Sequence, residues 1–246
     1  MTHFVVQFHN LAGGKEVEYD RHLQGLPGEL GRGLIRLQRY RLSNTQFPAS
    51  TSAAQLYRGV TLFEIDDALL SDRRAILAAQ LRVPRETGLL EADRTHLFHI
   101  VRHQTSNVSR ELAGDAEHLM ILMANYMPGM RDEWGAWYDE VHGPEGLGVP
   151  GVKACTRGLL ADAQLDSEAE QPAAGVVIYR FGTGDFPGVV REFVARATGS
   201  SSTGIKWASR SPAVGPNRTT HAFDAVGPRS GTGNRGSTSR HAVGRH

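Results

Sequence analysis

The densest group of chemically useful side chains lies between residues 132 and 145. Within it, Trp134, Tyr138 and His142 follow one another at intervals of four residues, which places them on one face of an α-helix together with Trp137. An imidazole titrates near neutral pH, so His142 is a candidate general acid or base, and Tyr138 could donate a hydrogen bond to a developing oxyanion. The alternative is structural, because a lone histidine at a helix end is commonly a cap or core residue.

The surroundings of His142 favour its protonated form. We expect the helix to end soon after it, because Pro144 cannot continue a helix, and the negative end of the helix dipole attracts an imidazolium. Asp139, Glu140 and Glu145 add negative charge nearby. Asp139 or Glu140 could also orient the ring, although a helix turns both partly away from it.

A second set of candidates lies in two similar strings, Thr-His-x-Phe-x-x-Val, at 95–101 and 220–226. Alternate residues of a strand share a face, so each string turns its histidine and phenylalanine to one side. The residues predicted to point inward are His96, Phe98, His221 and Phe223. We expect each histidine to lie across a cavity from the helical histidine of its own half, where the pair could divide proton removal from proton delivery. A buried, hydrogen-bonded histidine is the alternative.

These strings belong to an internal repeat with a spacing of about 118 residues. Tyr19-Asp20 precedes His22 as Tyr138-Asp139 precedes His142, and Arg39 corresponds to Arg157. Hydrophobic periodicity in each copy predicts the order strand, helix, strand, strand, helix, strand, which is the ferredoxin-like pattern. We therefore predict an α+β fold in which two tandem βαββαβ units form one α+β barrel, with helices outside and a cavity between the facing sheets.

The predicted domains are a first repeat at 1–104, a second repeat at 117–226 and a basic tail at 227–246. The stretch 104–117 is polar and is typical of a linker. The tail is rich in Gly, Ser, Thr and Arg and has almost nothing to bury, so it is expected to be disordered.

Composition excludes several function classes. The 246 residues carry 27 Lys and Arg against 26 Asp and Glu, which argues against nucleic acid as a partner. Cys155 is the only cysteine, so neither a disulfide framework nor a thiolate metal site is expected. No apolar run is long enough for a membrane span and no secretory signal is visible, so we expect a cytoplasmic protein without membrane contact. Histidine spacing and glycine motifs predict no metal or other cofactor, and a homodimer is possible.

Residues 137–145, Trp-Tyr-Asp-Glu-Val-His-Gly-Pro-Glu, are followed by a Pro-Gly turn at 150–151 and by Arg157. This pattern resembles the signature of the EthD-like branch of the dimeric α+β barrel superfamily. The first half resembles it less closely, because His22 follows its tyrosine by three positions instead of four and no Pro-Glu comes after it. The resemblance implies the barrel fold over about residues 1–226. It implies a wide range of reactions, since such proteins include cofactor-free monooxygenases, polyketide cyclases, lactone-forming dehalogenating enzymes, haem-degrading enzymes and ether-degradation accessory proteins.

We predict an enzyme without cofactor that uses histidine acid/base chemistry on a small apolar or aromatic carbonyl substrate, as a lyase, isomerase or cyclase. His142 is the main candidate catalyst, and His22 is its counterpart in the first copy. Trp134, Trp137, Phe98 and Phe223 are the candidate substrate-binding residues. The alternative is a monooxygenase-like or accessory protein that binds a hydrophobic ligand or haem.

Overall fold

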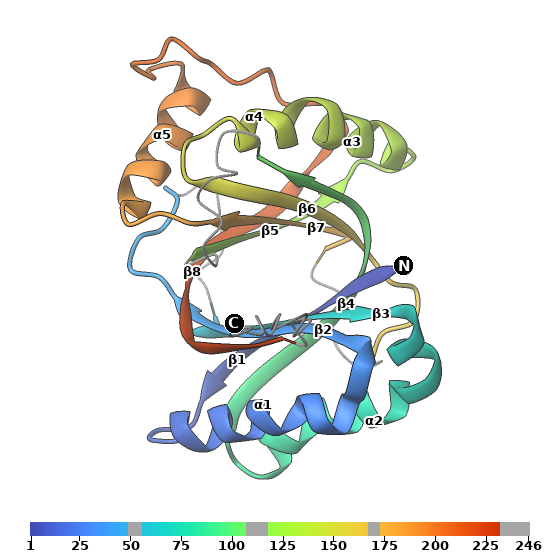
Figure 1. Ribbon diagram of the computed structural model, residues 1–246. Coiled ribbons are helices and arrows are strands. Elements are labelled where there is room, and N and C mark those ends of the chain that lie inside the picture. Colours follow the sequence, from blue (N-terminus) through green and yellow to red (C-terminus); the bar gives the residue numbers. More distant parts are fainter. Residues whose placement is uncertain (49–55, 107–117, 167–172, 232–246) are drawn as a thin grey trace, which may run out of the picture.

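The computed structural model describes residues 1–48, 56–106, 118–166 and 173–231 (Figure 1). The elements of the first half are β1 (Thr2–Leu11), α1 (Glu16–Leu30), the short turn η1 (Gly31–Gly33), β2 (Leu34–Leu42), β3 (Gly59–Asp66), α2 (Asp67–Glu86) and β4 (Leu90–Thr105). Those of the second half are β5 (His118–Tyr126), α3 (Arg131–Trp137), the π-helical turn η2 (Tyr138–His142), α4 (Gly143–Leu147), β6 (Val152–Leu160), β7 (Gly175–Phe181), α5 (Phe186–Thr198) and β8 (Val214–Gly231). Both halves follow the order predicted from the sequence.

The strands of the described chain form one closed antiparallel barrel in the order β1-β3-β2-β8-β5-β7-β6-β4. The first half contributes β4-β1-β3-β2, and the second half repeats this order as β8-β5-β7-β6. The halves join at two seams, where β2 pairs with β8 and β4 pairs with β6. The predicted α+β class, with two ferredoxin-like units in one barrel, is confirmed.

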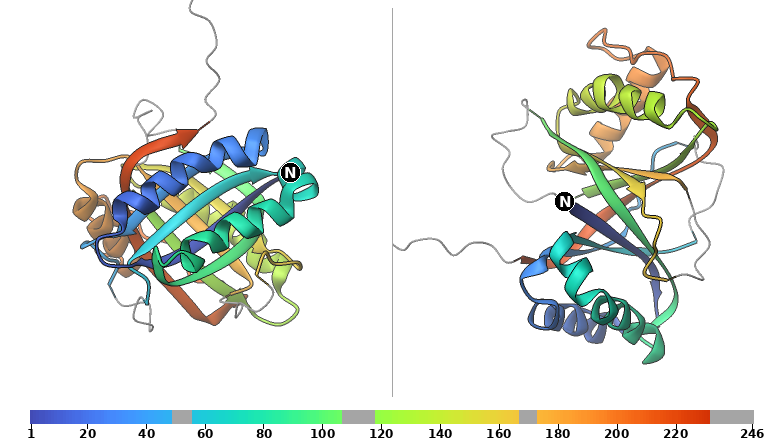
Figure 2. Two further views of the ribbon diagram at one scale, coloured as in Figure 1. Left: turned by 90° about the horizontal axis from the view of Figure 1, so that it is seen from below. Right: turned by 90° about the vertical axis from the view of Figure 1, so that its right-hand side faces the viewer.

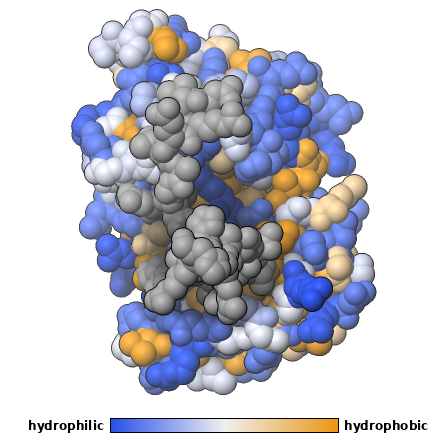
Figure 3. Space-filling model, viewed as in Figure 1, coloured by the Kyte–Doolittle hydropathy of each residue, from blue (hydrophilic) through white to orange (hydrophobic). Residues whose placement is uncertain are grey.

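The helices lie outside the barrel in two layers. Helices α1 and α2 cover one sheet, and α3, α4 and α5 cover the other (Figures 1 and 2). The strands are therefore buried on both faces, which is why β5 is almost continuously apolar and why most residues of β1 are buried although half of them are polar. In the view of Figure 3 the outward side chains of both layers are mainly hydrophilic. Within the described residues, no helix is both long and apolar enough to cross a membrane.

Local sequence sets the ends of the covering helices. The Asp66 carboxylate accepts a hydrogen bond from the Leu69 amide at 2.9 Å and caps α2, and Asp185 caps α5 through the Gly188 amide at the same distance. Helix α5 ends at Gly199, whose φ of +75° is the left-handed conformation that glycine adopts without strain. This stop directs the chain back across the second sheet.

Side chains from both sheets fill the interior of the barrel. Val6, Ile121 and Ile178 are almost completely buried there, and the rings of Phe8 and Phe223 approach to 6.3 Å between centroids. Large apolar side chains from both sheets therefore meet in the space where the sequence predicts a cavity.

The ends of the repeats differ slightly from the sequence-based boundaries. Strand β4 extends to Thr105, and β8 extends to Gly231, where it pairs with Arg36 of β2. The first residues of the expected tail thus belong to a strand, because the unpaired backbone groups at the edge of β2 form a ladder with them. Residues 107–117 of the expected linker and 232–246 of the expected tail lie outside the described residues.

Candidate active site

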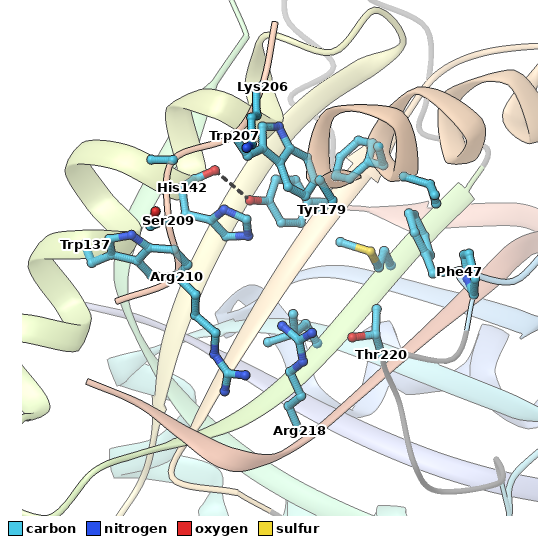
Figure 4. A pocket seen from close by; sticks show the side chains of 17 residues that line it. Phe47, Trp137, His142, Tyr179, Lys206, Trp207, Ser209, Arg210, Arg218 and Thr220 are labelled. Carbon is cyan, nitrogen blue, oxygen red and sulfur yellow. Dashed lines mark hydrogen bonds between the residues drawn. The ribbon is translucent and has the colours of Figure 1, made fainter. Parts of the chain in front are cut away.

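A pocket of about 520 Å³ lies between the outer face of the second sheet and its helical layer (Figure 4). This volume is within the range of roughly 300–1,000 Å³ that is usual for small-molecule sites. Strands β5, β7 and β8 form its floor, while α3, η2, α5 and the segment before β8 form its walls. The lining residues include Phe47, Met120, Leu122, Trp137, His142, Tyr179, Phe193, Lys206, Trp207, Ser209, Arg210, Arg218 and Thr220. The pocket is therefore mainly apolar, with five aromatic rings and five polar side chains besides His142.

His142 enters this pocket from the π-helical turn. Residues five apart face the same side of such a turn, so the imidazole stacks on Trp137, with ring centroids 4.6 Å apart and planes 10° apart. Trp207 packs edge-on against the same ring at 5.1 Å. The helical segment ends soon after His142, as expected: Pro144 occupies the first turn of α4, and α4 ends at Leu147. Two tryptophans thus fix the plane of the imidazole.

The two ring nitrogens of His142 have different surroundings. Nδ1 lies 3.5 Å from Oε2 of Glu145, whose Oε1 accepts a hydrogen bond from the Ala208 amide at 2.6 Å. Burial opposes ionisation of Glu145, but the nearby imidazole and the hydrogen bond from the Ala208 amide outweigh it and lower the pKa of Glu145. The carboxylate is therefore ionised near neutral pH and lies beside Nδ1 of the imidazole.

Tyr179 holds the backbone of the π turn. Its hydroxyl donates to the carbonyl oxygen of His142 at 3.3 Å, as the dashed line in Figure 4 shows. Burial raises the pKa of Tyr179 well above its ordinary value, so it stays a phenol and a donor. Gly146 allows α4 to approach, because a Cβ atom there would lie 2.5 Å from the Tyr179 ring. This contact anchors the segment that carries the imidazole.

Tyr138 and Trp134 do not line the pocket. They belong to the hydrophobic core between the second sheet and its helices. Both are buried, with ring centroids 5.0 Å apart, and burial raises the pKa of Tyr138. The Arg157 guanidinium lies 5.3 Å from the centre of the Trp134 ring. Of the four predicted substrate-binding residues, only Trp137 lines the pocket. Trp134 instead packs the helix onto the sheet.

Asp139 does not orient the imidazole. It binds Arg157 through two hydrogen bonds of 2.9 and 2.6 Å, and Glu145 takes the place expected for Asp139 or Glu140. The first half has the same ion pair, in which Asp20 contacts Arg39 at 2.7 Å. The matched Asp–Arg spacing of the repeat therefore corresponds to an ion pair that joins a helical segment to a strand in each half, and we call each pair an Asp–Arg clamp.

His22 lies between α1 and α2, apart from the pocket. It stacks loosely on Tyr19 at 6.4 Å, and burial is the main cause that lowers its pKa, against a hydrogen bond with the Gln80 backbone. In this half the Tyr19 hydroxyl is hydrogen-bonded to the Thr61 hydroxyl at 2.9 Å. The predicted equivalence of His22 and His142 does not extend to their surroundings.

The inward-facing candidates lie on the other side of the second sheet. Thr220 lines the pocket, so the alternation of the strand turns His221 and Phe223 into the barrel. His96 and Phe98 also point into the barrel, and burial lowers the pKa of His96 to about 4. Their predicted orientation is correct, but the expected pairing with a helical histidine across a cavity is wrong. A sheet separates His221 from His142.

Sequence reasoning missed several lining residues, chiefly Tyr179, Trp207, Arg210 and Arg218. Trp207 and Arg210 belong to the segment between α5 and β8, which composition alone marks as loop. A signal was present, because a tryptophan and two basic residues within 206–210 are unusual for a solvated loop. Arg218 shares the outer face of β8 with Thr220 and could have been found by the same alternation that placed His221.

The described residues contain no group of three or more His, Cys, Asp or Glu side chains that could hold a metal ion. The site offers one imidazole backed by a carboxylate, an aromatic enclosure and two guanidinium groups. Such an arrangement can bind a flat ligand and exchange a proton with it.

No family model matches the sequence, and no curated protein is similar to it in sequence. Solved structures do share its fold. An anthrone oxidase-like protein superposes with a TM-score of 0.61 at 10% identity, covering 97% of this chain and 96% of its own. A protein of Lactobacillus acidophilus assigned as a monooxygenase gives 0.54 at 10% identity, with 91% and 93% coverage. Another from Fusobacterium nucleatum gives 0.55 at 6% identity, with 94% of each chain covered. These likenesses define the class of the fold, a ferredoxin-like α+β barrel, and do not identify the EthD-like branch.

Proposed function

We propose that the protein is a monooxygenase-like enzyme without a resident cofactor, in which His142 removes a proton from a flat aromatic substrate. The observation that carries this proposal is the position of the imidazole. It lines an aromatic pocket, with Trp137 on its face and the ionised Glu145 at Nδ1. The Nε2 atom is then the base that faces the substrate.

The proposed chemistry begins with an acidic C–H or O–H bond next to a carbonyl or ring system. His142 takes the proton, and Glu145 stabilises the imidazolium that forms. The substrate anion is electron-rich and reacts with dioxygen. For an anthrone the balance is one substrate and one O₂ giving one anthraquinone and one water. The aromatic rings cover part of the pocket and so reduce contact of the anion with bulk water.

Two considerations favour oxidation over the lyase, isomerase or cyclase chemistry expected from the sequence. The first is that the structural relatives at nearly full coverage include an anthrone oxidase-like protein and two proteins assigned as monooxygenases. The second is that no second imidazole or carboxylate lines the described pocket to return the proton at another atom. The EthD-like resemblance of residues 137–157 is compatible with either outcome and belongs to the proposal.

The test is oxygen uptake with anthrone as probe, followed with an oxygen electrode and by the appearance of anthraquinone. The protein should accelerate the reaction, and His142→Gln should lower kcat by about 10²–10⁴-fold, the usual contribution of a general base. His103→Gln is the matched control, because His103 lies on β4 and contacts Thr156 instead of the pocket. Wild-type rates in His142→Gln, or no uptake above the spontaneous rate, would contradict the proposal. Substrate turnover without oxygen uptake would favour isomerisation or cyclisation.

A second candidate is haem binding, and one observation favours it. An imidazole whose Nδ1 faces a carboxylate has the arrangement that supports axial ligation of iron through Nε2. His142 would hold the iron, and the group would supply redox chemistry. A Soret band on titration with haem, absent from His142→Gln, would support this candidate. A homodimer remains a separate proposal that light scattering can test.

A further inference from the structure

Three basic side chains line the pocket beside its aromatic rings, namely Lys206, Arg210 and Arg218. No residue in the described lining carries a carboxylate. Arg210 and Arg218 have no carboxylate within ion-pair distance among the described residues. Figure 4 shows the guanidinium groups of both arginines on one side of the pocket, with Arg210 running down from the segment before β8 and Arg218 rising from β8. Arg210 is exposed and Arg218 is partly buried, so an anion from solvent can reach both.

Arg210 is held in place by the protein backbone. One of its terminal nitrogens donates to the carbonyl oxygens of Val214 and Gly215, at 3.2 and 2.5 Å. These bonds fix the direction of the guanidinium plane. Its remaining N–H groups are available to a ligand. Although Arg210 is exposed, these bonds hold its guanidinium in one direction before a ligand binds.

The two arginines are close enough for their charges to repel each other. Burial lowers the pKa of Arg210, and the charge of Arg218 lowers it further. An anion placed between them would remove this repulsion. Carboxylates match the guanidinium fork well, because they accept two parallel hydrogen bonds.

The internal repeat provides a comparison within the same chain. The string at 95–101 aligns Thr95 with Thr220, so the position of Arg218 in β8 corresponds to Asp93 in β4. The Asp93 carboxylate accepts a hydrogen bond from the Gln7 side chain at 3.2 Å and forms an ion pair with Arg85 at 3.8 Å. The hollow beside it also contains Glu86 and Asp166. The two copies thus have opposite charge at one position, and only the second combines cations with aromatic walls.

We propose that the pocket binds an aromatic carboxylate, whose rings lie among Trp137, Trp207 and Phe193 and whose carboxylate is bound by Arg210 and Arg218. This inference rests on the proposed function, because it names the substrate class of the pocket that contains His142. The carboxylate holds the ring system at one end of the pocket, and the acidic bond to be broken faces the imidazole.

The experiment compares 2-naphthoate with its neutral analogue 2-naphthamide by calorimetric titration of the full chain. Hydrogen bonds to charged groups predict that the naphthoate binds about 10- to 100-fold more tightly. Arg218→Gln should remove most of this preference, because Arg218 makes no other polar contact among the described residues. Arg191→Gln is the charge-matched control, since Arg191 is an exposed residue of α5 paired weakly with Asp185. Thermal unfolding of each variant checks that the fold is intact.

Equal affinity for the two probes, a preference that survives in Arg218→Gln, or no binding of either probe would overturn the proposal. The same titration with His142→Gln separates it from the proposed function. Retained preference in that variant supports the anion site whether or not the protein turns over a substrate. Oxygen uptake with neutral anthrone but no preference for naphthoate would leave the enzyme proposal standing and overturn this one. Haem, which carries carboxylates on an aromatic ring system, is titrated separately, and a Soret band that weakens in Arg218→Gln assigns the arginines to a porphyrin.

Discussion

The rings of Trp137 and His142 stack 4.6 Å apart although an α-helix would separate residues five apart onto different faces. The π turn between them makes this contact possible. Stacking of this kind contributes about 0.5–1.5 kcal/mol beyond burial of the rings. Its larger consequence is orientation, because the stacking fixes the plane in which the imidazole lines the pocket.

Replacement of Trp137 by leucine should therefore reduce catalysis more than stability. We expect a fall of at least about ten-fold in kcat/KM, since a small misplacement of a catalytic group is costly. The free energy of unfolding should fall by about 1 kcal/mol from the lost ring contact. Steady-state oxygen uptake and denaturant unfolding measure the two effects. A rate equal to wild type would show that the stacked plane is unimportant.

Glu145→Gln tests the carboxylate at Nδ1. Because the pKa of Glu145 is lowered in the folded state, its ionised form stabilises the fold above the unfolded value near 4.5 and this stabilisation is lost as pH falls through the folded value. The variant should be less stable than wild type at neutral pH, and the difference should disappear in acid. It should also lose activity, as the imidazolium loses its counter-ion. Melting temperatures from pH 3 to pH 8 measure the first effect.

Much of the architecture could be predicted from sequence, because repeat and alternation are local patterns. They place Phe98 and Phe223 on inward faces correctly and give the order of strands and helices along the chain. They could not show that the barrel interior is filled, since filling depends on side chains from both sheets meeting. The π turn was also hidden, because its hydrogen bonds do not follow from spacing. Sequence spacing places three acids near His142, among them Glu145. Only the structure shows that Arg157 binds Asp139, so that Asp139 is not the carboxylate beside the imidazole.

The two Asp–Arg clamps allow the halves to be compared. The Asp139 side chain is 23% exposed and that of Asp20 is 38% exposed, so loss of the charge should cost more in the second half. We expect Asp139→Asn to lower the free energy of unfolding by about 1–2 kcal/mol, after discounting for solvent screening. It should also lower activity, because Asp139 belongs to the π turn that carries His142. Asp20→Asn should lower stability slightly and leave turnover unchanged, and equal loss of activity in both variants would contradict a site confined to the second half.

His96 provides a test of the filled barrel. Burial lowers its pKa from 6.5 to about 4, and its Nε2 is buried without a hydrogen-bond partner in the described structure. The fold keeps this imidazole neutral, while the unfolded chain binds a proton below pH 6.5. Stability should therefore be complete above that pH and should decline as pH falls toward 4, by at most about 3 kcal/mol from this residue. His96→Leu removes the titrating group from an apolar interior, so its melting temperature should change less than that of wild type between pH 7 and pH 4. A pH profile unaltered by His96→Leu would mean that water reaches this imidazole, and that the interior between the sheets is more open than the packed arrangement of Phe8 and Phe223 allows.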